Sequence, residues 1–204
     1  MSQYTFLCFD TETTGLPKNF QYDGLDKDAW STARLLELGC ILFVIDTDKH
    51  IYKIKEYSLL RKYVMNEEEF NSSNPIHGIT NEDLEKGVEI EKILKKFRKL
   101  YNRAHYIIGH NVDFDINVLV NEFNLDGDYF YNELLNTDKK LCTAKYKFNV
   151  DIYDNLEMIK REKYIKLINL YTELFPDKTY IQHRALTDAI ATAECFTKQL
   201  FISF

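Results

Sequence analysis

The sequence predicts an α/β domain built around a mixed sheet. Three segments with the apolar character of strands come first, and segments with helical, strand and helical patterns alternate after them. The composition is that of a globular chain, with 45% hydrophobic and 28% charged residues. No internal repeat and no linker-like stretch interrupts the 204 residues. We therefore expect a single domain that spans residues 1–204.

Three strands are expected in the first 60 residues. Residues 4–9 are apolar and aromatic and lead into the polar run DTETTG, which predicts a buried strand with carboxylates at its C-terminal end. Residues 17–33 are mixed and polar, which indicates a loop. Apolar patterns at 35–45 and 51–60 predict two further strands. The turn-forming residues 46–49 between them predict a hairpin.

The middle of the chain predicts a helix and then a short strand. Thr80 has the character of a helix N-cap, with Asp83 as the acid three residues later. Apolar residues recur at helical spacing through 90–101, which predicts an amphipathic helix. Residues 106–109 are a short apolar run and are expected to form a strand.

Helices dominate the rest of the expected structure. Apolar residues spaced along 114–123 predict a helix directly after that strand. The stretch 124–138 is polar and rich in Asn and Asp, so we expect it to be irregular. Residues 164–174 carry another amphipathic pattern, and a last helix is expected over 185–200.

The bulk chemistry excludes several classes of protein. No nucleotide-binding P-loop, no Gly-x-Gly-x-x-Gly and no Gly-x-Ser-x-Gly element occurs. The four cysteines are far apart, which excludes a zinc ribbon and indicates free thiols in a reducing compartment. No signal peptide and no membrane-length apolar segment is visible, so we expect an intracellular, cytoplasmic protein without a membrane partner.

The net charge of −6 speaks weakly against a nucleic-acid partner, because proteins that bind polyanions usually have a basic face. A metal site weakens this objection. Such a site needs clustered carboxylates, and bound divalent cations reverse the sign of the local charge.

Asp10 and Glu12 are candidate metal ligands. They are two residues apart at a predicted strand end, and side chains at that spacing point to the same side of a strand. Two neighbouring carboxylates repel each other and lose hydration, and a divalent cation removes both costs. The alternative is two solvated acids at the start of a loop, which the pattern by itself leaves equally open.

A second acidic candidate opens the helix expected after the strand 106–109. Asp113 is explained by the preference of helix N-termini for acids. Asp115 needs a further reason, and metal binding would supply one.

The third candidate group begins the last helix. Ala185, Ala189 and Ala193 are four residues apart, and this stripe lets the helix approach whatever lies beneath it. Asp188 borders that contact. His183 is five residues earlier and is expected just before the helix, and without further context a lone histidine is more often a surface residue than a catalyst.

In this order, three segments resemble the motifs of the DEDDh family of 3′–5′ exonucleases. They are residues 10–16 (DTETTGL), 110–115 (HNVDFD) and 183–189 (HRALTDA), and two weaker elements at 37–39 and 76–80 agree. The related subfamily with a catalytic tyrosine has it four residues before the last aspartate, where this chain has Arg184. His183 stands where the histidine subfamily has its base, so the histidine subfamily is the better match.

The resemblance implies a ribonuclease H-like fold, a five-stranded mixed sheet flanked by helices on both sides. It also implies a metal-dependent 3′→5′ exonuclease that releases nucleoside 5′-monophosphates. By this resemblance Asp10 would bridge two Mg²⁺ or Mn²⁺ ions, Glu12 and Asp188 would hold the first, and Asp115 would support the second. His183 would be the general base.

The resemblance extends to substrate contacts and partners. Backbone groups of the segment after the first acidic pair would cradle the terminal nucleotide, a leucine would lie against its base, and two further side chains would approach it. These residues are Thr13, Thr14, Gly15, Leu16, His77 and Asn111. The expected partner is the 3′ end of single-stranded DNA or RNA, together with a polymerase or replication protein.

Loops beside the active site determine which nucleic acid is bound, so the catalytic residues by themselves do not predict whether the substrate is DNA or RNA. DNA is slightly favoured, and an RNA exonuclease is the alternative. A more remote alternative is an inactive member of the family that serves as a binding module.

Overall fold

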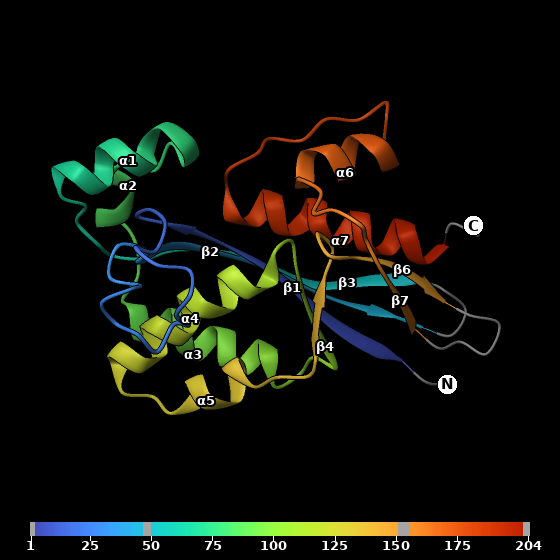
Figure 1. The fold of residues 1–204 in the computed structure, drawn as a ribbon, viewed down its shortest axis with the longest axis horizontal. Coiled ribbons are helices and arrows are strands. Elements are labelled where there is room, and N and C mark those ends of the chain that lie inside the picture. The colour runs from blue at the N-terminus through green and yellow to red at the C-terminus, as the bar shows by residue number, and fades with distance from the viewer. Residues whose placement is uncertain (1–2, 47–49, 151–155, 202–204) are drawn as a thin grey trace.

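The computed structural model describes residues 3–46, 50–150 and 156–201 (Figure 1). Its central feature is a five-stranded sheet with the order β3-β2-β1-β4-β5. The strands are β1 (Tyr4–Thr13), β2 (Leu35–Ile45), β3 (Ile51–Leu60), β4 (Tyr106–Gly109) and β5 (Lys140–Cys142). The expected mixed sheet is confirmed, because β2 is antiparallel to β1 and β3, whereas β4 is parallel to β1 and β5.

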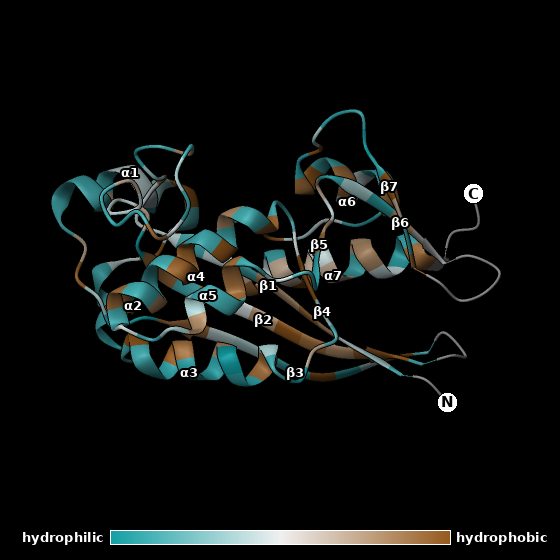
Figure 2. Ribbon diagram, turned by 60° about the horizontal axis from the view of Figure 1, so that its bottom comes forward, coloured by the Kyte–Doolittle hydropathy of each residue, from teal (hydrophilic) through white to brown (hydrophobic). Residues whose placement is uncertain are grey.

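Helices cover both faces of this sheet, as the expected fold requires (Figure 1). One layer contains α3 (Ile90–Tyr101), α4 (Val112–Asp126) and α5 (Phe130–Leu135), and the other contains α6 (Leu167–Leu174) and α7 (Ala185–Phe201). Successive side chains of β1 point alternately toward the two helix layers. Leu7 and Phe9 belong to the hydrophobic cluster of the first layer, and Phe6 and Cys8 to the cluster that includes α7. In Figure 2, β1 and β2 are accordingly hydrophobic along much of their length.

The remaining elements lie at the ends of the sheet. Two short helices, α1 (Glu67–His77) and α2 (Asn81–Glu85), follow β3. The predicted cap at Thr80 is confirmed, since its Oγ1 accepts a 3.2 Å hydrogen bond from the backbone of Asp83 and the Asp83 carboxylate accepts one from the backbone of Thr80 at 3.0 Å. A separate antiparallel hairpin is formed by β6 (Tyr146–Val150) and β7 (Leu156–Lys160).

The structure corrects two boundaries. Residues 124–138 were expected to be irregular, but α5 lies within them because Phe130 and Leu134, one helical turn apart, are both buried. The ring of Phe130 packs against Tyr101 and Phe123, with centroids 5.1 and 5.0 Å away. The first strand also continues through Thr13, with a register irregularity after Glu12, so its acids lie inside the strand and not beyond it.

The antiparallel pairing of β2 and β3 confirms the predicted hairpin. Its turn residues 47–49 lie outside the described residues. The helix expected over 164–174 begins only at Leu167. Within the described parts of the chain, no helix combines the length and apolar character needed to cross a bilayer.

Candidate active site

Three carboxylates from distant parts of the chain meet at one end of the sheet. Asp10 and Glu12 lie in β1, and Asp188 lies in the first turn of α7. One carboxylate oxygen of each residue lies within 4.8 Å of those of the other two. Glu12 and Asp188 are each only 9% exposed. Oxygen ligands at this spacing match what hard divalent cations bind.

Close packing of α7 on β2 brings Asp188 to this place. A Cβ atom at Gly39 of β2 would lie 2.1 Å from the carbonyl carbon of Ala185, so any side chain there would push the start of the helix away. Ala185, Ala189 and Ala193 are all buried, as their spacing predicted. The small residues on both elements therefore set the height of Asp188 above the sheet.

Within the described residues, the two oxygens of Asp188 differ in their hydrogen bonding. Its Oδ2 accepts a 2.9 Å hydrogen bond from the backbone N–H of His183. Its Oδ1 is buried and has no hydrogen-bond partner in the described part of the chain. A buried carboxylate oxygen without a donor is costly, and a cation would satisfy it.

The electrostatics indicate the same need for positive charge. Burial, followed by the charges of Asp115 and Glu12, raises the pKa of Asp10 well above its ordinary value. Burial and the neighbouring charge of Asp188 raise the pKa of Glu12 to about 8. Burial is also the main reason that the pKa of Asp188 is raised. These carboxylates resist ionisation together, and a divalent cation between them would reverse that effect.

Asp115 lies beside this group but is held differently. Its Oδ1 accepts hydrogen bonds from the backbone N–H of Thr11 at 2.9 Å and from the Thr11 hydroxyl at 2.7 Å. Burial raises its pKa to about 7, although the bonds from Thr11 oppose the shift. Asp113, in contrast, pairs with Lys145 and, at 2.9 Å, with Lys140. The structure therefore separates the two acids, and Asp115 is the one oriented toward β1.

His183 precedes α7, as its spacing predicted. It is exposed and has a left-handed backbone conformation with φ of 63°. The next residue, Arg184, forms a two-pronged ion pair with Glu37, at 2.9 Å from Nε and 3.1 Å from the terminal nitrogen. Glu37 is buried directly across from Glu12 in the sheet. Arg184 therefore compensates the negative charge of buried Glu37.

The segment after Glu12 is rigid up to an exposed leucine. The Thr13 hydroxyl donates to the carbonyl of Gly15 at 2.7 Å, and the backbone N–H of Thr14 donates to the carbonyl of Arg34 at 2.9 Å. Leu16 follows with 66% of its surface exposed. An exposed apolar side chain on a fixed segment beside the carboxylates is suited to contact a base.

The two other expected substrate residues occupy different environments. His77 ends α1 and is buried, and its Nδ1 accepts a 3.0 Å hydrogen bond from the backbone of Ile79. Burial lowers the pKa of His77, while the backbone of Thr13 acts in the opposite direction. Asn111 precedes α4 in a left-handed conformation with φ of 68°, and its exposed side chain makes no capping bond. Its amide is therefore available for a ligand.

Comparison with known proteins decides the family. The family model RNase_T, described as exonuclease, matches residues 7–196, which is most of the chain. The chain belongs to the RNase T family of exonucleases. The DEDDh-type 3′–5′ exonuclease assignment that the motifs implied is confirmed at this level.

One relative of this exonuclease chain is the PolC-type DNA polymerase III of Mycoplasmopsis pulmonis (strain UAB CTIP). The two are 28% identical over 133 residues, which cover 65% of this chain and 8% of the polymerase. The chain thus matches only a small part of that relative's length.

Similar folds occur among solved structures. The structure of E. coli exonuclease I with a dA16 oligonucleotide has a TM-score of 0.58 at 16% identity and covers 95% of this chain and 40% of its own. Cell-death related nuclease 4 has a TM-score of 0.56 at 13% identity, with 95% and 62% covered. These similarities confirm the predicted ribonuclease H-like fold.

Sequence reasoning missed an ion-pair network that anchors the loop 17–34 of this exonuclease. Buried Glu122 of α4 accepts from Nε of Arg34 at 2.8 Å and from Arg61 at 3.0 Å. An acid within an otherwise apolar helical run was the available signal. Trp30 in the same loop is buried, and its indole donates to the carbonyl of Tyr22 at 2.9 Å.

Tyr180 was also not anticipated as part of the site. Burial and, after it, the charge of Asp188 raise the pKa of Tyr180. Its ring packs on Tyr171 of α6 with centroids 4.8 Å apart. No local pattern around Tyr180 in the sequence points to this contact.

Proposed function

We propose that this chain, as one exonuclease domain over residues 1–204, removes nucleotides from the 3′ end of a single-stranded nucleic acid, with DNA favoured over RNA. The reaction is metal-dependent hydrolysis of the terminal phosphodiester bond and releases nucleoside 5′-monophosphates. The observation that carries this proposal is the largely buried group of Asp10, Glu12 and Asp188, in which one carboxylate oxygen of each residue lies within 4.8 Å of those of the other two. The DNA preference is supported by a relative that is a DNA polymerase and by similar structures solved with DNA oligonucleotides.

The donor set fits two divalent cations, Mg²⁺ or Mn²⁺. Asp10, Glu12 and Asp188 would hold the first, and Asp10 and Asp115 would hold the second. The unpartnered Oδ1 of Asp188 and the raised pKa values of the acids support this assignment. When bound, such ions supply a more acidic water and charge compensation for the leaving 3′ oxygen.

His183 is assigned the role of general base. Its imidazole makes no hydrogen bond within the described residues, whereas its backbone N–H is tied to Asp188 at 2.9 Å. The ring is therefore held near the carboxylate group but is left with a nitrogen available to accept the proton of the attacking water. Exposure of His183 also allows the ring to move between solvent and substrate.

Substrate positioning is assigned to the fixed segment that follows β1. Thr13, Thr14 and Gly15 would contact the terminal nucleotide through their backbone, and Leu16 would pack on its base. Asn111 would donate a hydrogen bond from its side-chain amide to the terminal nucleotide. His77 would support the same segment by contacting the backbone of Thr13. The hydrogen bonds that immobilise Thr13 and Thr14 support this arrangement, because a rigid cradle loses little entropy on binding.

The test is release of nucleotides from 5′-labelled DNA and RNA, single-stranded and duplex, with Mg²⁺ and with EDTA. We expect a ladder shortened from the 3′ end, faster on single-stranded DNA than on matched RNA. Asp10→Ala and Asp188→Ala are expected to abolish release, as EDTA does. Asp126→Asn is the matched control, because it removes an exposed acid from the far end of α4.

Three outcomes would count against parts of the proposal. Undiminished release in EDTA would sink the metal mechanism. Faster release from RNA would reverse the substrate preference. No release by the wild-type chain under any condition would indicate a binding module without catalysis.

A further inference from the structure

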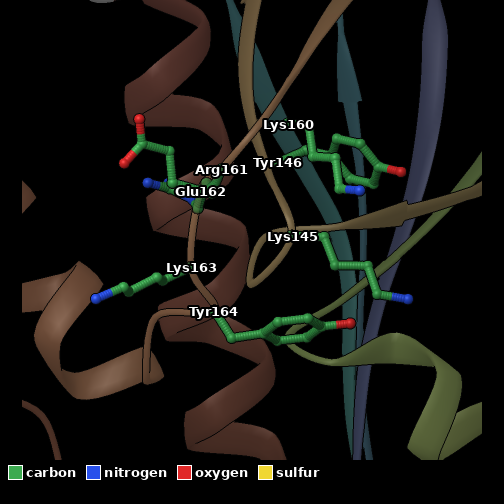
Figure 3. Close-up of a pocket in the computed structure, with 7 residues that line it drawn as sticks. All are labelled: Lys145, Tyr146, Lys160, Arg161, Glu162, Lys163 and Tyr164. Carbon is green, nitrogen blue, oxygen red and sulfur yellow. The ribbon is translucent and has the colours of Figure 1, made fainter.

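An open pocket lies at the base of the hairpin of β6 and β7, outside the carboxylate group. Its volume is about 280 Å³, and residues 145–146 and 160–164 line it (Figure 3). We call it the hairpin pocket. Its volume lies near the lower end of small-ligand sites, about 300–1,000 Å³, so it suits one base or phosphate group and not a folded partner.

The charge of the hairpin pocket is opposite to that of the chain. The lining contains Lys145, Lys160, Arg161 and Lys163 against Glu162 alone, although the chain has a net charge of −6. Lys145 is paired with an aspartate. In the described residues, no carboxylate lies within ion-pair distance of the other three cations. The guanidinium of Arg161 donates to Gln199 of α7 at 3.3 Å, whereas Lys160 and Lys163 are exposed. An anionic ligand would pair with these exposed amines.

Aromatic rings alternate with these amines. Tyr164 is 62% exposed, and the Nζ of Lys145 lies 5.8 Å from its ring centroid. Tyr146 pairs across the hairpin with Lys160. Figure 3 shows the side chains of Lys145 and Tyr164 extending side by side in one direction, with Tyr146 and Lys160 together above them. Of the two rings, Tyr164 is exposed and Tyr146 is partly buried against the core. An exposed ring beside cations can stack a base while the cations contact phosphates, without sequence preference.

The hairpin pocket is attached to the elements that carry the proposed active site. Lys145 bonds to Asp113, which lies two residues before Asp115 in the first turn of α4. The ring Nε2 of His110, at the end of β4, lies 2.8 Å from the carbonyl oxygen of Ile165, just beyond the pocket. These contacts attach the pocket to the segment between β4 and α4 that positions Asp115.

We propose that the hairpin pocket binds the single-stranded nucleic acid on the 5′ side of the nucleotide being removed, with a base stacked on Tyr164 and a backbone phosphate facing Lys160. The inference rests on the proposed function, since that function supplies a strand with its 3′ end at the carboxylates. An acidic protein would explain the cations but not the exposed ring of Tyr164 beside them.

Binding is measured first, in EDTA, by fluorescence anisotropy of a 5′-labelled oligonucleotide of about 12 thymidines, a length within the usual range for single-strand sites. Tyr164→Ala is expected to weaken binding roughly tenfold, and Tyr164→Phe to retain it, because the ring and not the hydroxyl stacks. Lys160→Glu is expected to weaken binding and to reduce the slope of log affinity against log salt by about 0.7, the value for one lost phosphate contact on a single strand.

Matched controls are available on distant surfaces. Tyr129→Ala removes an exposed tyrosine, and Lys95→Glu makes the same charge change on the exposed side of α3. Both are expected to bind like the wild type. Thermal unfolding of each variant checks that the fold is intact.

The second measurement separates this inference from the proposed function. With Mg²⁺, the wild-type kcat/KM is expected to rise from a dinucleotide to the longer strand, and the pocket variants are expected to lose most of that rise. Full binding and an unchanged length dependence in both Tyr164→Ala and Lys160→Glu would overturn the pocket. So would binding of an acidic peptide that depends on these residues while oligonucleotide binding does not. Absence of nucleotide release by the wild type would count against the proposed function, and the anisotropy result would still decide the pocket.

Discussion

Replacing Glu12 by glutamine is expected to stabilise the metal-free protein while it removes a proposed metal ligand. Burial and the charge of Asp188 raise the pKa of Glu12 from 4.5 to about 8. Between these values the folded protein keeps a proton that the unfolded chain has released. The free energy of unfolding therefore falls as the pH rises from about 4.5 to about 8 and levels off above that. At pH 7 the loss is about 3 kcal/mol, because each pH unit above 4.5 contributes about 1.4 kcal/mol.

The assay is thermal unfolding in EDTA across this pH range. Glu12→Gln is expected to unfold about 6–12 °C above the wild type at pH 7, since 1 kcal/mol shifts the midpoint by about 2–4 °C in a chain of this size. The difference should shrink toward pH 4.5. Added Mg²⁺ should stabilise the wild type more than the variant. Glu85→Gln, which changes an exposed acid at the end of α2, is the control and should shift nothing. Equal midpoints for Glu12→Gln and wild type at pH 7 would refute the repulsion on which the metal assignment depends.

Three further predictions concern the residues around this group. His183→Ala is expected to slow nucleotide release about 100- to 10,000-fold, the usual contribution of a general base, while the Mg²⁺-induced rise in midpoint remains; full activity would mean that another group takes the proton. Gly39→Ala is expected to destabilise the fold by about 1–3 kcal/mol and to lower kcat, because its Cβ would displace the backbone of Ala185; wild-type values in urea unfolding and in the release assay would contradict the packing. Arg184→Ala is expected to cost about 1.5–3 kcal/mol by leaving buried Glu37 without its charged partner, and Glu37→Gln in the same chain should recover part of that loss in the same unfolding measurement.

The core of the fold was predictable because its signals are local. The bounds predicted for β2, β3 and β4 agree with the structure residue for residue, since apolar runs and turn residues delimit each strand. The hairpin of β6 and β7 was not predicted, because β7 has only five residues and most of it is exposed, so no alternation of buried and exposed positions marks it. Helix α5 was missed for a related reason: only Phe130 and Leu134 mark its buried side within a polar stretch.

The candidate site likewise contains residues that local sequence patterns predict and contacts that they do not. The pairing of Asp10 with Glu12 follows from strand geometry, and the alanine stripe of α7 made the approach of Asp188 foreseeable. The choice of Asp115 over Asp113 came from the family motif, and the structure supplies the physical reason in the bonds from Thr11. Contacts between residues far apart in the chain left no local trace. The ion pair of Glu37 with Arg184, separated by 147 residues, is the main example.

That ion pair restricts how this exonuclease could evolve. In the related subfamily, a catalytic tyrosine occupies the position that Arg184 holds here. Arg184→Tyr alone would leave the buried charge of Glu37 without a partner beside Glu12. This cost would arise before a new catalytic group could contribute to activity. A passage between the two subfamilies therefore requires that the acid on β2 be neutralised first.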